Sequence, residues 1–357
     1  MKYSGIKELY STFLLRHRMR ECNKRIPMHI SKPLTKEELM NIKNRWNWLL
    51  KDRLVDSSYL KCYSFYKHFS DNDNVNANLV PSDFYYLVTR KLNTGWGKGF
   101  LSHKANLHFF IPESNRPITI VYNVSGCLFD KNDNILDRAS ACSLLLKYSQ
   151  FVYKKALYTG GGKGVKKYSN PTIEELERIV QTSDFIIQEI VQQSDFFSQL
   201  NSSSVNTIRM ETLNLHNKCS VLSSFIRIGA KDSFVDNISG RDGMVVGIDD
   251  KGRLCDYGLT HDYSKVYRAT SGVLFKGLVV PDYERIKETV CGFHLRMPMI
   301  KLINWDIAID SMGNVLIIEV NLDSMNPLYH QVFNGPIFHE RTEEVMSYMT
   351  KEGKSSF

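Results

Sequence analysis

Paired cysteines, long apolar runs and the usual nucleotide-binding loops are all missing from this sequence. Its seven cysteines are scattered, odd in number and without a CxxC spacing, which argues against a disulfide framework or a zinc site and favours a reducing compartment. No apolar run approaches the roughly 18 residues that cross a bilayer, and the first residues lack the apolar core of a signal peptide. We therefore expect a cytoplasmic protein.

Two common nucleotide-binding motifs are also absent. No stretch of the chain matches the Walker A pattern or the GxGxxG fingerprint. The sequence therefore gives no support to a P-loop fold or a dinucleotide-binding Rossmann fold.

Basic charge is concentrated at one end of the chain. Residues 1–55 hold 13 Lys or Arg against 5 Asp or Glu, whereas the rest of the chain holds 33 of each kind. We expect this basic helical arm to present a solvated face, or to contact the inner face of a membrane or a partner glycosyltransferase. Nucleic acid is the least favoured partner, because the arm has few aromatic side chains for base stacking.

The remaining sequence predicts a folded chain that mixes helices with strands. We predict helices over 5–22, 35–53, 82–92, 139–146 and 172–182. Capping boxes of Thr35 with Glu38 and of Thr172 with Glu175 are expected to open the second and the last of them. We predict strands over 118–124, 151–156, 185–191, 205–213, 219–228, 244–248 and, as a hairpin, 303–321. The polar stretch 70–78 indicates a loop and a boundary. This order favours α+β subdomains over one doubly wound sheet.

The segment from Ile303 to Asn321 predicts a β-hairpin with Met312 and Gly313 in its turn. In that register Asp306 lies opposite Glu319, and Asn321 shares their face because side chains alternate along a strand. Like charges placed opposite each other destabilise a sheet, and a cation between them would remove that cost. Mg²⁺ bound with nucleotide phosphates is the usual cation; an exposed acidic pair at a strand end is the alternative.

A glycine-rich loop follows a strand that ends in lysine. Lys154 lies near the end of the predicted strand 151–156, and the loop after it contains Gly160, Gly161, Gly162, Lys163 and Gly164. Consecutive glycines can turn several N–H groups toward one anion, and a strand-end lysine adds a point charge for phosphate. A flexible hairpin loop is the alternative interpretation.

Three later segments add weaker signals. Arg209 and Arg227 lie in apolar strands, where arginine is costly unless its planar fork meets a carboxylate or phosphate; the alternative is a solvated face for each. Asn237 follows in a glycine turn. The strand over 185–191 ends in polar residues, so its main chain could meet the edge of an adenine ring in a hinge.

Taken in order, these features resemble the ATP-grasp superfamily. More narrowly they resemble its sugar-transfer-associated branch, with an Arg/Arg/Asn/Asp/Glu-x-Asn series shared with ribosomal-protein glutamate ligases. The resemblance runs from about Trp46 to about Pro336 and includes Lys104 in Ser-His-Lys-Ala-Asn. It implies an α+β fold in which two subdomains clasp ATP, preceded by a helical arm and a small N-terminal α/β region.

The resemblance also implies four regions along the chain. These are the basic arm 1–55, a region 56–135 packing on the core, a small subdomain 136–200 with lid and hinge, and a large subdomain 201–350 with the metal site. Lys155, Asn304, Gly240-Arg241-Asp242 and Tyr267–Thr270 depart from the family pattern. The last three departures lie where the acceptor region is expected, so they bear on the substrate rather than on ATP.

Each motif acquires an expected role from the resemblance. Phosphates of ATP would be held by Lys104 and Lys154, under a lid formed by residues 160–164. Adenine would be held by the main chain of Gln188, Glu189, Ile190 and Val191, and ribose would meet Asp195 or Gln192. One or two Mg²⁺ ions, or Mn²⁺ in their place, would be held by Asp306, Glu319 and Asn321. The substrate carboxylate and the transferring phosphoryl group would be met by Arg209, Arg227 and Asn237.

The expected activity is that of an ADP-forming ligase. An acyl phosphate would form from a carboxylate and ATP, and an amine would then displace phosphate to give an amide. The family context implies a sugar or amino-acid carboxylate in surface-polysaccharide synthesis. A phosphotransferase on the same scaffold, and a non-catalytic nucleotide-binding partner of a glycosyltransferase, are the alternatives.

Overall fold

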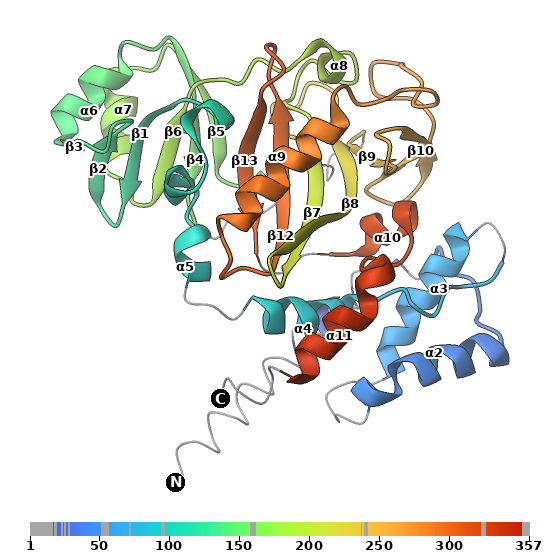
Figure 1. The fold of residues 1–357 in the computed structure, drawn as a ribbon. Coiled ribbons are helices and arrows are strands. Elements are labelled where there is room, and N and C mark those ends of the chain that lie inside the picture. Colours follow the sequence, from blue (N-terminus) through green and yellow to red (C-terminus); the bar gives the residue numbers. More distant parts are fainter. Residues whose placement is uncertain are drawn as a thin grey trace, which may run out of the picture. The chain divides into compact units, whose positions relative to one another are not determined.

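The computed structural model describes residues 17, 20–22, 24, 26–27, 29–50, 57–70, 73–93, 97–157, 162–236, 238, 242–322 and 326–351 (Figure 1). The chain divides into two compact units, one formed by Met1–Thr94 with Asp323–Phe357 and the other by Gly95–Leu322. Most of the predicted helix over 5–22 lies outside the described residues, as do Gly160, Gly161, Asn237, Gly240 and Arg241. In the described part of the chain, every helix is too short or too polar to cross a membrane.

The unit made from the two ends of the chain is helical. Its elements are α2 (Lys36–Leu50), η1 (Ser57–Tyr59), α3 (Leu60–Phe69), α4 (Ser82–Leu92), α10 (Leu328–Asn334), η4 (His339–Arg341) and α11 (Thr342–Lys351). The predicted capping box opens α2: the Thr35 N–H donates to the Glu38 carboxylate over 2.7 Å, and the Glu38 N–H donates to the Thr35 hydroxyl over 3.2 Å. Aromatic side chains fill its core, such as Trp46 edge-on to Phe84 at 5.4 Å between ring centroids.

Glu38 also forms the buried ion pair of this unit. Lys67 donates to its carboxylate over 2.7 Å, and the Val75 N–H donates over 3.1 Å, which ties the loop before α4 to α2. Burial alone would raise the pKa of Glu38, but these donors together lower it to about 2. A carboxyl whose folded-state pKa is depressed contributes stability above its unfolded pKa and loses it on acidification.

Glu38→Gln is expected to destabilise this unit by about 3 kcal/mol, because it leaves the Lys67 ammonium buried without a counter-charge. The wild type should itself lose this contribution as the pH falls from about 4.5 to about 2. Hydrogen exchange of peptides from α2 and α3 measures both effects. The neighbouring exposed residue gives the control, Glu37→Gln, and equal exchange in the two variants would contradict the assignment.

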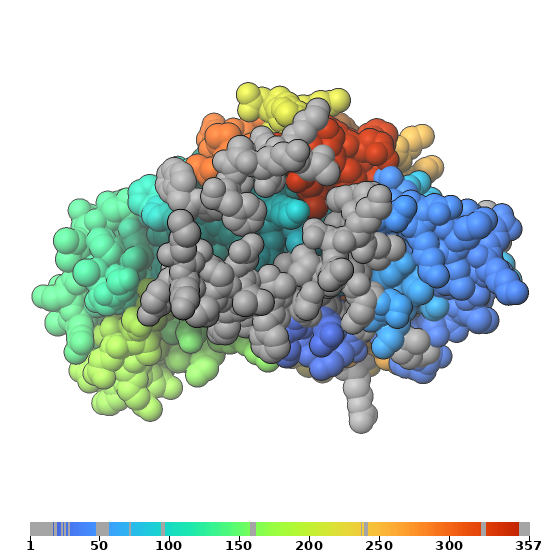
Figure 2. Space-filling model, turned by 90° about the horizontal axis from the view of Figure 1, so that it is seen from below, coloured from blue at the N-terminus to red at the C-terminus, as the bar shows by residue number. Residues whose placement is uncertain are grey.

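The other unit begins with short helices and a six-stranded antiparallel sheet of order β3-β2-β1-β6-β4-β5. The short helices are α5 (Gly97–Leu101), η2 (Lys104–Phe109) and η3 (Glu113–Asn115). The strands are β1 (Thr119–Val124), β2 (Cys127–Asp130), β3 (Ile135–Leu136), β4 (Gln150–Lys155), β5 (Val165–Ser169) and β6 (Phe185–Gln188). Two helices, α6 (Arg138–Leu145) and α7 (Ile173–Val180), lie side by side and pack on this sheet (Figure 1). In the space-filling view, the green atoms of this part of the chain gather at the left (Figure 2). The predicted capping box of Thr172 and Glu175 opens α7.

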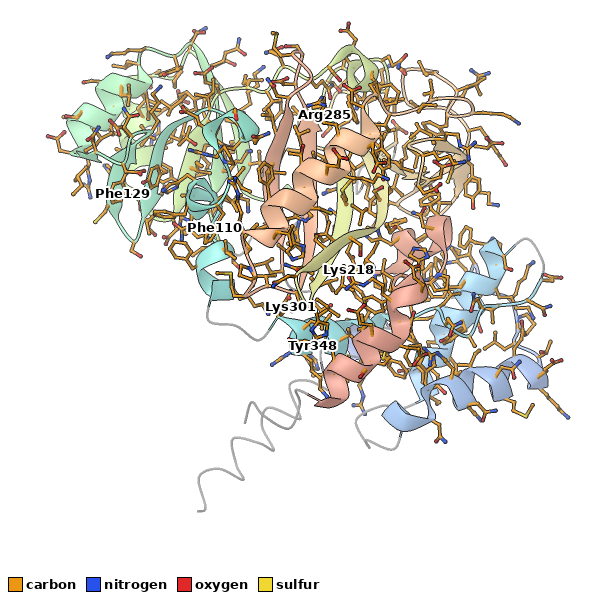
Figure 3. All side chains as sticks on the ribbon, viewed as in Figure 1. Phe110, Phe129, Lys218, Arg285, Lys301 and Tyr348 are labelled. Atoms are coloured by element: carbon orange, nitrogen blue, oxygen red, sulfur yellow. The ribbon has the colours of Figure 1, made fainter. Side chains whose placement is uncertain are left out.

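The same unit continues into a seven-stranded antiparallel sheet of order β11-β10-β9-β8-β7-β12-β13. Its strands are β7 (Thr207–Leu215), β8 (Lys218–Ile228), β9 (Met244–Ile248), β10 (Leu254–Thr260), β11 (Lys265–Val266), β12 (Leu302–Ile309) and β13 (Val315–Asn321). The helix α9 (Tyr283–Leu295) packs on one face, and α8 (Asp195–Ser198) follows the crossing from the first sheet. The side chain of Arg285 on α9 donates to the carbonyl of Gly313 over 2.8 Å, which ties the helix to the β12–β13 turn (Figure 3). The α+β fold class is therefore confirmed.

The β12–β13 hairpin reaches its predicted pairing by a different route. Its turn has three residues, not two: the Asp310 N–H donates to the Asn314 carbonyl over 3.1 Å, and Gly313 takes a φ of +82°. Such a turn alone would slip the register by one residue and send Glu319 to the opposite face. A bulge at Ile318 cancels the slip, so Asp306 does lie opposite Glu319.

Two of the regions expected from the sequence have boundaries that differ from those of the observed sheets. The region 56–135 is not one α/β unit, because residues 57–93 are helical and belong with the C-terminal helices. Strands β1, β2 and β3 complete the sheet of β4, β5 and β6, since β1 pairs with β6. The large sheet ends at Asn321, before the helices over 328–351. The sequence could not show these pairings, because they join strands far apart along the chain.

Candidate functional site

A cleft between the two sheets collects most of the predicted site residues. It encloses about 920 Å³ of space between atoms, open solvent at its mouth included. Its predicted members are Lys104, Lys154, Gly162, Glu189, Ile190, Val191, Arg209, Arg227, Asp306, Glu319 and Asn321. Further lining residues, which the sequence did not single out as site residues, are Val152, Val165, Val205, Thr207, Phe234, Val235, Asp236 and Ile318.

Asp306 sits at the centre of a charge network on the large sheet. Its carboxylate accepts two hydrogen bonds from the guanidinium of Arg209, on the neighbouring strand β7; one of them, from an Nη atom, is 2.8 Å long. Arg227, on β8, lies 3.4 Å from the same carboxylate and 3.5 Å from Asp236. The side chains share this face because each occupies the alternate position to the apolar residues under α9.

Glu319 is paired from the other side of the cleft. Lys104, the first residue of η2, donates to its carboxylate over 3.0 Å. The bulge turns Ile318 and Glu319 toward the cleft together, although they are consecutive in sequence. The pairing of Asp306 with arginines and Glu319 with a lysine differs from a site prearranged around a metal ion.

Lys154, near the end of β4, is half-buried and donates to the side chain of Gln188 over 2.9 Å. Burial, and next the positive charge of Lys104, lower the pKa of Lys154 to about 8, although Glu319 and Asp236 act in the opposite direction. A nearby phosphate would stabilise the charged ammonium and raise this pKa again. Anion binding should therefore be coupled to proton uptake near pH 8.

ATP binding at pH 8 is expected to take up about half a proton per site, because about half of the Lys154 side chains are neutral in the free protein at that pH. Affinity should fall as the pH rises above 8. Calorimetric titrations in two buffers of different ionisation enthalpy measure this uptake. Lys154→Arg should bind ATP without it, since arginine stays charged; a buffer-independent enthalpy in the wild type would refute the coupling.

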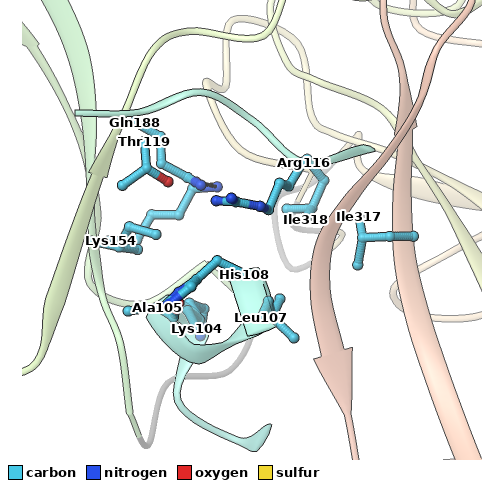
Figure 4. Close-up of a pocket in the computed structure, with 11 residues that line it drawn as sticks. Lys104, Ala105, Leu107, His108, Arg116, Thr119, Lys154, Gln188, Ile317 and Ile318 are labelled. Atoms are coloured by element: carbon cyan, nitrogen blue, oxygen red, sulfur yellow. Dashed lines mark hydrogen bonds between the residues drawn. The ribbon is translucent and has the colours of Figure 1, made fainter. Parts of the chain in front are cut away.

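A smaller pocket, of about 310 Å³ with open solvent included, adjoins the cleft beside the two lysines. Arg116 and Lys154 point toward one another across it, with Lys104 and His108 on the short helix η2 (Figure 4). Among the described residues that line it there is no carboxylate. Arg116, held by a 3.1 Å hydrogen bond to the Ile111 carbonyl, is therefore a cation of the site that the sequence analysis missed.

The hinge after β6 offers free main-chain groups to the cleft. The Glu189 N–H donates to the Ile118 carbonyl, and the chain rejoins the large sheet where the Ser194 N–H donates to the Ile309 carbonyl. Between them, the main chains of Ile190 and Val191 form no hydrogen bond within the described part of the chain. Apolar Val152, Val205 and Ile318 line the same cleft, so a flat polar ring could be held at its edge here.

The described end of the glycine loop reaches across the cleft. Gly162 has a φ of +73°, and a Cβ added there would lie 3.2 Å from the Val235 side chain. Lys163 and Gly164 are exposed and do not line the cleft. Asp195 and Gln192 are also exposed and outside the lining, so the structure does not bring the two expected ribose residues to the site.

The charged side chains that line the cleft determine whether a metal ion and a polyphosphate fit it. Four cationic side chains line it, and so do four carboxylates, three of which are paired with those cations: Asp236, Asp306 and Glu319. A polyphosphate alone would take the cations and leave buried carboxylates unpaired, which is costly. A polyphosphate entering with a divalent cation fits, because the metal can take up the released carboxylates. The described residues hold no group of three or more His, Cys, Asp and Glu suited to a metal, so Asn321 and phosphate oxygens would have to complete its shell.

A family model described as sugar-transfer associated ATP-grasp matches residues 127–347, which is more than half of the chain. The match covers every predicted site residue except Lys104. The assignment of Lys104 to the site depends on its ion pair with Glu319. No protein of curated function matches the sequence.

Solved structures of ligases resemble the fold at low identity. D-alanyl-alanine synthetase A from Vibrio cholerae is 12% identical with a TM-score of 0.41, over 72% of this chain and 66% of that one. The D-alanine–D-alanine ligase from Coxiella burnetii is 8% identical with a TM-score of 0.41, over 72% and 61%. The ATP-grasp ligase PsnB, complexed with a minimal precursor, is 10% identical with a TM-score of 0.41, over 89% and 77%. The chain thus spans slightly under two thirds of the first two.

Proposed function

The chain belongs to the sugar-transfer-associated ATP-grasp family, and on that premise we propose that it is an ATP-dependent ligase that joins a carboxylate to an amine. The observation that carries the proposal is the charge pairing of the cleft, in which Asp306 and Glu319 are held by Arg209 and Lys104. Each pair joins a carboxylate that could bind a metal ion to a cation that could bind phosphate. A nucleotide that arrives with its metal satisfies both sets at once.

The residues divide by what they can bind. Lys104, Lys154 and Arg116 are the cations for the phosphates of ATP, and the open main chain of Ile190 and Val191 is the edge for adenine. Asp306, Glu319 and Asn321 would hold Mg²⁺, which supplies Lewis-acid stabilisation of phosphoryl oxygens when bound. Once released from Asp306, Arg209 and Arg227 would meet a carboxylate and the transferring phosphoryl group. Asn237 and the glycine loop keep their expected roles as acceptor contact and lid.

The proposed reaction needs no covalent intermediate with the protein. A substrate carboxylate oxygen attacks the γ-phosphorus of ATP, the bond to the β-phosphate oxygen breaks, and ADP leaves. An amine then attacks the acyl carbon, loses a proton, and releases inorganic phosphate to form an amide. Positioning of the reactants and stabilisation of the phosphoryl charge by the arginines accelerate the first step. Closure of the lid over the cleft would keep water from the acyl phosphate.

We propose a sugar or amino-acid carboxylate in surface-polysaccharide synthesis as the substrate class, by analogy with a family described as sugar-transfer associated. We propose that the basic arm over 1–55 docks the enzyme to a glycosyltransferase or to the inner face of the membrane. Of its described residues, Lys24 forms an exposed ion pair with Glu21 at 2.6 Å. Deleting the arm tests this part: unchanged membrane association would end it.

Hydroxylamine provides a general amine for testing the ligase. The full chain is incubated with ATP, Mg²⁺, hydroxylamine and a panel of uronic and amino acids labelled with ¹⁸O in the carboxylate. A ligase should release ADP, form a hydroxamate and carry one ¹⁸O into inorganic phosphate. A phosphotransferase would instead give ADP and a phosphorylated acceptor with no label in phosphate. Binding of ATP without any turnover across the panel would favour the non-catalytic partner.

A further inference from the structure

Two cysteines far apart in sequence meet on the back of the large sheet. Cys219 is the second residue of β8, directly after Lys218 (labelled in Figure 3), and Cys291 lies on α9. The Cys219 sulfur lies 3.6 Å from Nδ1 of His294, which is one turn after Cys291 on α9, and this brings the two thiols within hydrogen-bonding reach of each other. Both side chains are partly accessible to solvent. They lie on the face that packs against α9, opposite the cleft, so the proposed ligase chemistry does not use them.

His294 lies beside these two thiols, and its hydrogen bonds define which ring nitrogen carries the proton. Its Nε2 lies 3.1 Å from the Ile300 carbonyl, which can only accept, so Nε2 carries the proton and Nδ1 is an acceptor. Nδ1 lies 2.7 Å from the Thr212 hydroxyl and 3.6 Å from the sulfur of Cys219. Burial lowers the pKa of His294 to about 4, so the ring stays neutral at physiological pH. The His294 ring beside Cys219 therefore does not change its charge within the physiological pH range.

The surroundings of Cys291 lower the pKa of its thiol. The largest cause is the hydrogen bond with Cys219; burial opposes it, and Lys287, one turn earlier on α9, adds to it. A partly exposed thiol with a lowered pKa beside a second cysteine is the arrangement of redox-sensing sites. By contrast, burial raises the pKa of Cys255 to about 11. The described residues hold no group of three or more His, Cys, Asp and Glu arranged for a metal, which argues against a zinc site here.

We propose that Cys291 and Cys219 form a reversible disulfide under peroxide, which ties α9 to β8. The Cys291 thiolate attacks a peroxide oxygen, the O–O bond breaks, and a sulfenic acid forms with loss of water. The Cys219 sulfur then attacks the sulfenic sulfur, loses its proton and releases a second water. Two thiols are oxidised and one peroxide is reduced. The new bond spans the segment from 219 to 291, which includes Arg227 and Asp236 of the cleft.

Peptide mapping after mild oxidation tests the proposal directly. The full chain is treated with a small excess of hydrogen peroxide, alkylated, digested and analysed by mass spectrometry, with diamide in a parallel sample. We expect one linked peptide pair, Cys219 to Cys291, that dithiothreitol reverses. The melting temperature should rise by several degrees on oxidation, because the bond restricts the unfolded chain.

Single variants separate the two thiols. Cys219→Ser should leave Cys291 as a sulfenic acid that dimedone labels, and Cys291→Ser should show neither label nor linkage. Cys127 is exposed and serves as the matched control, so Cys127→Ser should oxidise like the wild type. The proposal is overturned if Cys127 reacts with peroxide faster than Cys291, or if the linked peptides join other cysteines. Because the wild type alone gives both readouts, a variant that fails to fold does not obscure the result.

Discussion

Glu319→Gln is expected to lower the rate of ATP turnover by about 10³-fold. Stabilisation of phosphoryl charge by a bound metal is worth several kcal/mol, and about 1.4 kcal/mol corresponds to tenfold in rate. The amide keeps the size of the side chain and can still accept the 3.0 Å hydrogen bond from Lys104. The fold should therefore persist while the metal loses a negatively charged ligand. Turnover is measured as ADP release with saturating ATP and Mg²⁺.

An exposed glutamate on α9 provides the matched control for this loss. Glu288→Gln removes the same charge from the protein at a position outside the cleft, and its rate should equal that of the wild type. Raising the Mg²⁺ concentration should recover part of the Glu319→Gln rate, because the defect lies in metal affinity. A near-normal rate in Glu319→Gln at low Mg²⁺ would remove this residue from the metal site.

Arg209→Met is the second change with a large expected effect. It removes a cation proposed for the transferring phosphoryl group, so we expect turnover to fall by about 10²- to 10³-fold. It also leaves Asp306, buried in the sheet, with Arg227 at 3.4 Å as its remaining ion-pair partner among the described residues. Stability should fall by about 1–3 kcal/mol, the cost of an unsatisfied buried polar group. Urea denaturation measures the second effect.

A double variant tests the stability effect of Arg209 by itself. In Arg209→Met with Asp306→Asn, the unpaired charge is gone, so stability should return toward that of the wild type. Turnover should stay low, because the variant has also lost Asp306, a proposed metal ligand. Arg296→Met, at an exposed position after α9, controls for the loss of an arginine. Recovery of turnover in the double variant would remove both Arg209 and Asp306 from the proposed chemistry.

Local patterns in the sequence predicted the elements better than the way they assemble. The capping boxes at Thr35 and Thr172 and the alternation around Arg209 depend on neighbours a few residues apart, and the structure contains them. The prediction that Asp306 faces Glu319 is confirmed, but through two deviations that cancel, a three-residue turn and the bulge at Ile318. A prediction from strict alternation of side chains includes neither the longer turn nor the bulge. It gave the right pairing because the two shifts in register cancel.

Contacts between distant segments could not be predicted from spacing. Arg116 became part of the site only because η2 and the approach to β1 fold beside β4. Asp236 lines the cleft because its turn brings it to Arg227, 3.5 Å away. Asp195 was expected at the ribose, but its short helix begins after the chain has joined the large sheet, outside the lining. The scattered cysteines gave no spacing signal for the contact between Cys219 and Cys291.

A thermal-shift titration with ATP, with and without Mg²⁺, tests the central claim that this cleft binds the nucleotide together with its metal. A ligand at 100 times its Kd adds about 2.7 kcal/mol of stability, enough to raise the melting temperature by several degrees. The account predicts a large shift with ATP and Mg²⁺, a much smaller one with ATP alone, and a weakened Mg²⁺ effect in Glu319→Gln. Equal shifts with and without Mg²⁺, or no shift at all, would contradict it.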